Sequence, residues 1–250
     1  MTESKPWHEN EEFWHAFAPS LFPERRWENT PKEVDLILER LGVASGATIL
    51  DLCCGPGRHS LELSRRGFKV TGVDRTAAYL ESARTKAASE GLNTAFILGD
   101  MREYRNPGAF DAVINIFTSF GFFEDPADDR RVLKNAFDSV KPGGAFLMDL
   151  LGKEILARNF RESHWDEQED GTLMLESGRI EENWSRIRSR WILLKGTQRF
   201  ESAVVLRLFS AVELSAALRE AGFQSVEIFG DLAGAPYDQN AKRLVALARK

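Results

Sequence analysis

This sequence of 250 residues has only two cysteines, and it lacks long apolar runs and an excess of basic charge. The only two cysteines, Cys53 and Cys54, are adjacent, so a disulfide between them would be strained, and they are too few for a structural zinc site. No stretch approaches the ~20 apolar residues that a membrane span needs. Residues 1–12 also lack the apolar segment of a signal peptide. We therefore expect a reduced, soluble, cytoplasmic protein with no metal site and no membrane partner.

The charge balance argues against one further class of partner. The formal net charge is −5, and the chain has no sustained run of Lys and Arg. Because nucleic acids attract basic surfaces, we expect no nucleic-acid partner. Hydrophobic residues make up 43% and charged residues 28% of the chain, as in a soluble globular protein. A chain of this length can bury a large core as one elaborated α/β domain or as two smaller ones.

From Thr30 onward, short apolar runs alternate with helical patterns. The predicted strands are 48–52, 69–73, 95–98, 112–116, 145–150, 225–229 and 244–248. The predicted helices are 30–42, which opens on the capping box Thr30-Pro-Lys-Glu33, then 58–66, 76–90, 126–140 and 210–222. This alternation predicts a doubly wound, Rossmann-like α/β fold with a seven-stranded sheet, mostly parallel, whose last strand is antiparallel.

Two segments depart from the alternation. Residues 163–208 hold three β-leaning stretches, 172–176, 186–194 and 202–208, with no helix between them. They predict a small antiparallel β insertion after the fifth strand, which is a candidate region for substrate binding and for contact in a homodimer. Residues 1–29 are rich in Trp and Phe, and we predict that they form an N-terminal helical lid segment.

The strongest functional signal is the stretch Ile49-Leu-Asp-Leu-Cys-Cys-Gly-Pro-Gly-Arg-His-Ser60, a strand that enters a glycine turn and then a helix. Two glycines alone could merely serve a tight loop. Asp74, at the end of the next strand, can accept hydrogen bonds from the ribose hydroxyls of an adenosyl cofactor. Ser60 stands where a dinucleotide site favours Gly or Ala. Asp51 would be unfavourable beside a pyrophosphate but favourable opposite a sulfonium and an ammonium group, so an adenosyl sulfonium fits better than a dinucleotide.

Several motifs together resemble those of class I S-adenosylmethionine (SAM)-dependent methyltransferases. Residues 51–57 and 72–74 resemble motifs I and II, 99–102 the segment after the third strand, 110–121 the fourth-strand motif, and 141–144 the turn before the fifth strand. The resemblance covers residues 30–150 and 209–250. It implies a SAM-binding domain over 30–162 and 209–250, which transfers a methyl group to nitrogen or oxygen of a small molecule and releases S-adenosylhomocysteine. The insertion is similar, more loosely, to that of amino-sugar and glycine N-methyltransferases.

The resemblance also implies individual roles. Gly55 and Gly57 would pack against the methionine part of SAM, and Asp74 would bind the ribose with Arg75 beside it. Asp100 would bind the adenine amino group and Met101 would cover the ring, while Asn115 and Phe117 would lie beside the sulfonium. Plain core packing is the alternative for Met101 and Phe117. The expected cofactor-binding residues are Asp51, Cys53, Gly55, Gly57, His59, Asp74, Arg75, Asp100, Met101, Asn115 and Phe117.

Other side chains have competing interpretations. The six tryptophans, at positions 7, 14, 27, 165, 184 and 191, either form a lid over the substrate or anchor the two added segments. One face of a predicted strand carries Arg186, Arg188 and Arg190. We favour a solvated face on which these arginines pair with Glu181 and Glu182 over a face that attracts an anionic substrate. His59 contacts the cofactor carboxylate or caps its helix. Candidate contacts with less support are His164 and Tyr237 for the substrate, and Arg25 and Arg26 for the SAM carboxylate.

The sequence names no catalytic residue. No His and Asp stand at a spacing that identifies a general base, which slightly favours a nitrogen acceptor. Three alternatives stay open: a nicotinamide-dependent oxidoreductase, a non-catalytic SAM-binding module, and a different SAM chemistry such as aminopropyl or carboxymethyl transfer.

Overall fold

Seven strands form the main sheet in the order β10-β11-β5-β4-β1-β2-β3. The structure is a computed structural model that describes residues 5–250. The strands are β1 (Thr48–Leu52), β2 (Lys69–Asp74), β3 (Ala95–Leu98), β4 (Phe110–Asn115), β5 (Val140–Leu150), β10 (Ser225–Phe229) and β11 (Leu244–Arg249). Strands β1 to β5 pair in parallel, and β11 runs antiparallel to both of its neighbours. The predicted fold class is confirmed.

The antiparallel strand β11, the last in the chain, is not at the edge of the sheet. β11 lies between β5 and β10, so β10 is the edge strand. The exposure of the two strands explains this order. Residues 244–248 are all buried, whereas the side chains of β10 are exposed or half-buried. A continuous apolar run is stable only with a neighbour on each side and both faces covered.

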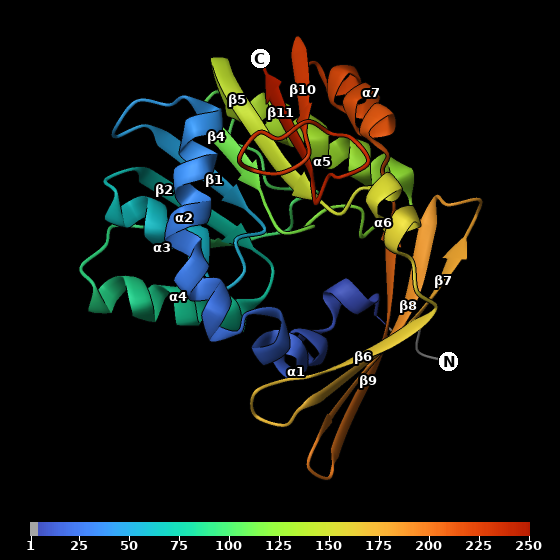
Figure 1. Ribbon diagram of the computed structural model, residues 1–250. Coiled ribbons are helices and arrows are strands. Elements are labelled where there is room, and N and C mark those ends of the chain that lie inside the picture. The colour runs from blue at the N-terminus through green and yellow to red at the C-terminus, as the bar shows by residue number, and fades with distance from the viewer. Residues whose placement is uncertain (1–4) are drawn as a thin grey trace.

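Helices cover both faces of this sheet (Figure 1). They are α2 (Glu24–Leu41), α3 (Arg58–Arg65), α4 (Ala77–Ser89), α5 (Pro126–Ser139) and α7 (Ala211–Ala221). α2 and α3 pack with Ile49 and Ile114 on one face, and α5 and α7 pack with Leu50 and Val113 on the other. Neighbouring residues of one strand thus enter opposite layers of the core. α7 opens on a capping box, in which the Ser210 hydroxyl accepts from the Glu213 backbone N–H.

The predicted start of α2 at Thr30 was wrong. The helix begins at Glu24 and runs through Pro31 to the left-handed Gly42. Thr30 sits inside the helix and donates its hydroxyl hydrogen bond to the Arg26 carbonyl, 2.8 Å away. Arg58 of α3 also donates to this carbonyl, at 2.8 Å. A Thr-Pro pair usually marks a first turn because proline disrupts a helix interior. Here Arg58, from another helix, supplies a hydrogen-bond donor close to Pro31. The local sequence does not reveal such a tertiary contact.

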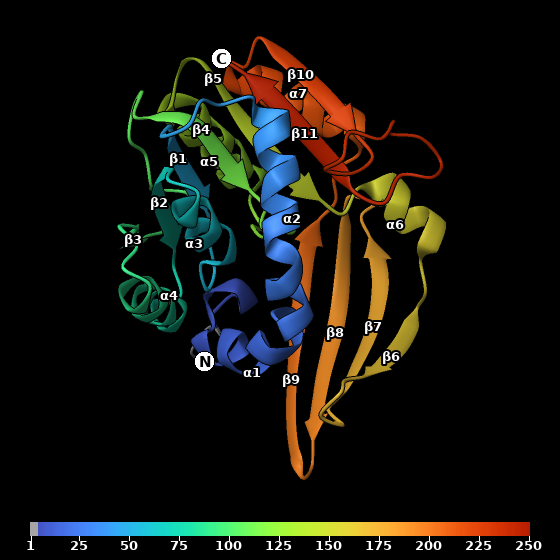
Figure 2. The same ribbon diagram turned by 60° about the vertical axis from the view of Figure 1, so that its left-hand side comes forward.

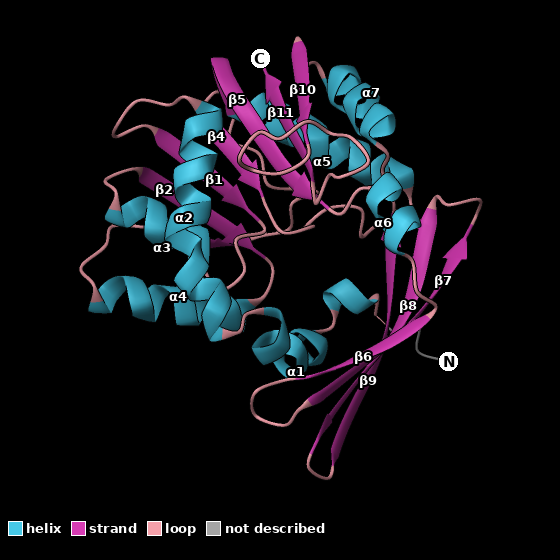
Figure 3. Cartoon of the chain, viewed as in Figure 1, coloured by secondary structure: helices cyan, strands magenta, loops and turns pink. Residues whose placement is uncertain are grey.

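The insertion forms a second, antiparallel sheet in the order β6-β7-β8-β9, which stands apart from the main sheet (Figure 3). Its strands are β6 (Ser163–Glu167), β7 (Leu173–Glu181), β8 (Arg186–Lys195) and β9 (Gln198–Arg207). Only three strands were predicted. β6 was missed because each of its side chains is exposed and no apolar alternation marks it. The short helix α6 (Lys153–Asn159), which joins the two sheets, was also missed.

The N-terminal segment lies against the second sheet. It consists of a 3-10 turn, η1 (Trp7–Glu9), and helix α1 (Glu11–Leu21), which Figures 1 and 2 both show beside β9. Phe13 and Phe17 of α1 form a buried cluster with Leu193 and Val204 from the sheet. The Trp7 indole N–H donates to the Val205 carbonyl at 3.0 Å. Within residues 5–250, none of the helices has both the length and the apolar run needed to cross a bilayer.

Candidate functional site

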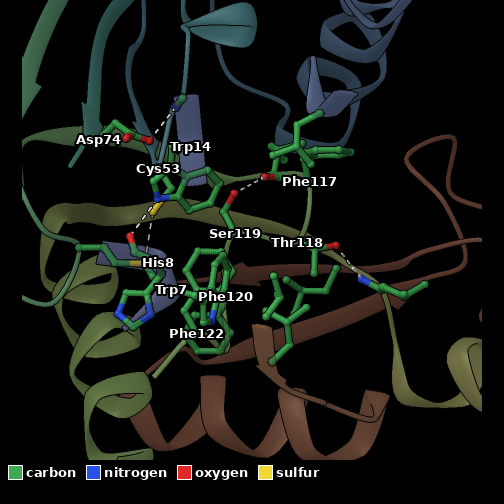
Figure 4. A pocket seen from close by; sticks show the side chains of 18 of the residues that line it. Trp7, His8, Trp14, Cys53, Asp74, Phe117, Thr118, Ser119, Phe120 and Phe122 are labelled. Atoms are coloured by element: carbon green, nitrogen blue, oxygen red, sulfur yellow. Dashed lines mark hydrogen bonds between the residues drawn. The ribbon is translucent and has the colours of Figure 1, made fainter. Parts of the chain in front are cut away.

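The ends of the parallel strands open into a cavity of about 370 Å³. Its walls come from the turn after β1, the ends of β2 and β3, the loop after β4, the N-terminal segment, and one face of the second sheet. Figure 4 shows Trp7 and His8 beside Phe122 on one side, with Phe117 and Thr118 across from them. Ligands of open α/β sheets bind at these carboxyl ends. One cavity therefore connects the predicted cofactor site to both added segments.

The glycine turn brings backbone close to the cavity. Gly55 and Gly57 have φ angles of 54° and 82°, which place both in the left-handed region. A Cβ on Gly57 would lie 2.9 Å from Cβ of Ala83, so α3 and α4 approach too closely for any side chain there. Gly57 caps the N-terminus of α3, whose first turn contains no acidic residue. The free N–H groups of this helix end are suited to an anionic group.

Asp74 both shapes the turn and faces the cavity. One carboxylate oxygen accepts from the Gly55 N–H at 2.9 Å, and the other accepts from the Thr76 N–H at 2.8 Å. Burial raises the pKa of this carboxyl, and these backbone donors partly offset the shift. A carboxylate has about four acceptor positions, so these two backbone donors do not saturate it, and Asp74 lines the cavity. That spare capacity fits a pair of ribose hydroxyls.

Asp51 is a second buried acid, at 2% exposure. It accepts a 2.6 Å hydrogen bond from the Ser60 hydroxyl. Burial raises the pKa of Asp51, while the nearby His59 and the Ser60 hydrogen bond act in the opposite direction. The serine that replaces the glycine of a dinucleotide site thus orients the acid at the end of β1.

Asp100 follows β3, an edge strand of the main sheet, and an arginine binds its carboxylate. Arg102 donates to its two oxygens at 3.0 and 2.6 Å, and the Arg102 backbone N–H adds a bond of 2.8 Å. Although burial alone would raise the pKa of Asp100, these Arg102 bonds lower it. Glu9 of η1 also binds Arg102, at 2.9 Å, and Arg75, at 3.2 Å. Ion pairs therefore tie the N-terminal segment to the ends of β2 and β3.

The loop after β4 has an unusual backbone. Phe117 and Thr118 both have positive φ angles, 68° and 58°. Asp149 of β5 holds this turn: its carboxylate accepts from the Phe117 N–H at 3.1 Å, and its carbonyl accepts from the Thr118 N–H at 2.8 Å. Arg243 in turn donates to the Asp149 carboxylate at 2.6 Å. Strained turns held from several sides are typical of functional sites.

Most of the expected cofactor residues line the cavity: Asp51, Cys53, Gly55, His59, Asp74, Arg75, Asp100, Met101 and Phe117. Gly57 and Asn115 lie behind its wall. The Asn115 amide joins two segments, since it donates to the Leu52 and Ser119 carbonyls at 3.1 Å each. Met101 also packs in the core at 5% exposure, with its sulfur 3.3 Å from that of Cys53.

His59 contacts a carboxylate of its own chain. Its Nε2 lies 2.9 Å from Glu33 of α2, which also pairs with Arg58 at 3.2 Å. Although burial would raise the pKa of Glu33, His59 and Arg58 lower it to about 2. Arg26 does not line the cavity and stacks on the Phe117 ring at 4.2 Å. Arg25 does not line it either.

The substrate candidates and tryptophans divide into two groups. Trp7, Trp14 and Trp191 line the cavity, whereas Trp27 packs under Lys86, Trp165 is 65% exposed and Trp184 contacts Phe160. His164 and Tyr237 are not in the wall of the cavity; the Tyr237 hydroxyl donates to Glu154 at 2.8 Å. Arg186 and Arg188 pair with Glu182 and Glu181 as the solvated-face interpretation predicts, and Arg190 pairs with Glu201.

Sequence reasoning missed several polar side chains of the cavity, among them His8 and Glu176. His8 is 6% exposed, and neither ring nitrogen has a hydrogen-bond partner within residues 5–250. Burial lowers its pKa to about 4, so the ring is neutral at neutral pH. No motif marks either residue, because only the packing of the added segments brings them to the strand ends.

Comparison with known proteins gives the family. A family model described as a methyltransferase domain matches residues 49–144. YqeM of Bacillus subtilis, whose name gives a methyltransferase without a substrate, is 30% identical over 207 residues, covering 81% of this chain and 83% of that protein. The CcbJ methyltransferase from Streptomyces caelestis has a similar structure, with a TM-score of 0.78 at 20% identity over 88% of this chain and 89% of that one.

A further solved structure is that of SAM-bound CalS10, an amino pentose methyltransferase from Micromonospora echinaspora. Its TM-score is 0.65 at 24% identity, covering 89% of this chain and 91% of that one. The chain belongs to the class I SAM-dependent methyltransferases. It is an enzyme whose cofactor is SAM, which decides against both the nicotinamide-dependent and the non-catalytic alternatives.

Proposed function

We propose that this enzyme methylates a small molecule bound between the N-terminal segment and the second sheet. The observation that carries the proposal is the continuity of the cavity, which extends from Asp74 and Asp100 to Trp191 and Leu206. A reacting pair can meet only if both partners share one enclosed space. A volume of about 370 Å³ is in the range of small-molecule sites.

The buried polar groups fit SAM in the orientation that the motifs imply. Asp74 has acceptor positions for the ribose, and Asp100 offers a carboxylate at the adenine end. Asp51 places negative charge near the glycine turn, where an ammonium group would be stabilised. SAM, when bound, supplies a methyl group on a positively charged sulfur. The protein binds and orients the two partners and excludes water.

In this proposal the N-terminal segment excludes water from the cavity. Trp7 and Trp14 line the cavity, and Glu9 anchors the segment to Arg75 and Arg102. In this proposal the covering segment ends before α2, which begins at Glu24 with Pro23 as its N-cap, rather than at residue 29. We assign residues 5–22 to the cover, the second sheet to the acceptor wall, and the remaining chain to the SAM-binding domain.

Calorimetry tests this assignment. The full chain is expected to bind SAM and S-adenosylhomocysteine, and not NAD. A chain without residues 1–22 should keep its main domain folded, as judged by circular dichroism. It should bind SAM more weakly, because the Glu9 ion pairs and the two indoles are lost. A chain without residues 1–4 is the matched control. Unchanged SAM affinity in the longer truncation would contradict the covering role, and NAD binding without SAM binding would contradict the proposed function.

A further inference from the structure

The second sheet presents an apolar face to the cavity, interrupted by few polar groups. Ile187, Val204 and Leu206 line this wall. Arg207 at the end of β9 also lines the cavity, but Asp129 compensates its charge; the other polar members of this wall are Glu176 of β7 and Ser189 of β8. Polar groups in an apolar wall fix the orientation and chemical type of a ligand. These two side chains therefore bear on the identity of the methyl acceptor.

The charges around the cavity are compensated, with one exception. Each arginine of the wall has its own carboxylate: Arg58 with Glu33, Arg75 with Glu9, Arg207 with Asp129, and Arg243 with Asp149. The acids at the strand ends accept hydrogen bonds: Asp51 from Ser60, Asp74 from two backbone N–H groups, and Asp100 from Arg102. The carboxylate of Glu176 accepts none from residues 5–250. His164 on the neighbouring strand is 3.7 Å away and half exposed.

A tryptophan lies across the strands from this glutamate, and two further rings pack on that tryptophan. Trp191 stands directly opposite Glu176 in the β7–β8 register, so their Cβ atoms are neighbours across the strands. Phe13 and Phe17 pack on Trp191 with ring centroids 5.9 and 5.8 Å apart. Only 27% of the Glu176 side chain is exposed. A carboxylate at this exposure is only partly hydrated, and a cation held between it and an aromatic ring would be stabilised by both.

We propose that Glu176, Ser189 and Trp191 form the acceptor subsite and that the acceptor is a small amine. The proposal rests on the proposed function. Glu176 binds the ammonium form, the Trp191 ring borders it, and the Ser189 hydroxyl takes a polar substituent beside the nitrogen. After one proton leaves to solvent, the nitrogen lone pair forms the N–CH₃ bond while the S–CH₃ electron pair stays on sulfur. The products are an N-methylammonium ion and S-adenosylhomocysteine.

Binding of two matched probes to the full chain saturated with S-adenosylhomocysteine tests the proposal. Cyclohexylammonium and cyclohexanol have similar shapes and differ in charge. Calorimetry or ligand-observed NMR at neutral pH should show the ammonium bound about tenfold more tightly, from ion pairing and cation–π contact together. Glu176→Gln should remove this preference. Glu167→Gln, at an exposed position of β6, should leave it unchanged.

The outcomes separate the two proposals. If the wild type binds S-adenosylhomocysteine but shows no preference for the ammonium, or binds neither probe at millimolar concentration, the acceptor subsite is wrong. A preference that persists in Glu176→Gln also overturns it, provided that this variant binds S-adenosylhomocysteine as tightly as the wild type. Failure of the wild type to bind S-adenosylhomocysteine would instead overturn the proposed function.

Discussion

Acidification should destabilise the fold through His8. The ring is buried among Trp7, Phe122 and Phe123, and within residues 5–250 its two nitrogens lack partners. Burial lowers its pKa from 6.5 to about 4; Glu9 opposes this shift, and the charges of Arg75 and Arg102 add to it. The unfolded chain therefore binds a proton at His8 at a higher pH than the folded chain does. The free energy of unfolding therefore decreases as the pH falls below 6.5, and it continues to decrease until the pH reaches about 4.

The size of the effect follows from the shift. A depression of 2.5 pKa units, from 6.5 to about 4, corresponds to a maximum of about 3 kcal/mol. Between pH 7.5 and pH 5, only part of this is realised, about 2 kcal/mol. Asp129 acts in the opposite direction, because burial raises its pKa to about 6 in spite of its bond with Arg207. The pH dependence of stability in the wild type alone thus reports the sum of several titrating groups.

His8→Leu isolates the contribution of the histidine. Leucine has a similar volume, does not titrate, and breaks no side-chain hydrogen bond. Urea unfolding followed by circular dichroism at pH 7.5 and pH 5 should show that the wild type loses about 2 kcal/mol more than the variant over this interval. NMR titration should place the His8 ring near 4. Parallel pH dependence in the two proteins, or titration of His8 near its unperturbed value, would refute the reasoning.

Three substitutions test other parts of the structure. Asp74→Ala should weaken SAM binding by more than ~1 kcal/mol in calorimetry, because the Gly55 N–H loses its acceptor together with the proposed ribose contact; an unchanged Kd would place the ribose elsewhere. Gly57→Ala should destabilise the fold by about 1–3 kcal/mol more than Gly46→Ala in urea unfolding. Both glycines have positive φ, but only at position 57 would the Cβ meet another side chain, so equal losses would contradict the close approach. Arg190→Ala should change neither Tm nor SAM affinity, since its pair with Glu201 is at the surface; a clear loss of SAM affinity would argue against a solvated face.

The sequence determined the main domain because its signals are local. Strand β1 could be assigned from the run Thr48–Leu52, since five consecutive positions supply the pattern and the glycines that follow end it. The left-handed positions of Gly55 and Gly57 need the one residue type that tolerates them freely. Charge reasoning then gave Asp51 its expected role, and the position of Asp74 at a strand end together with the family motifs gave Asp74 its own, before any contact was known.

The tertiary structure decided what depends on contacts distant in sequence. Thr30 lies within a helix because of an arginine 28 positions away in the chain. β6 has no apolar pattern and exists as a strand because β7 supplies its hydrogen-bond partners. His8 and Glu176 reach one cavity only after α1 packs on the second sheet. Residues far apart in the chain meet through packing, so no local pattern records their proximity, and the side chains of the proposed acceptor wall could not be assigned from the sequence.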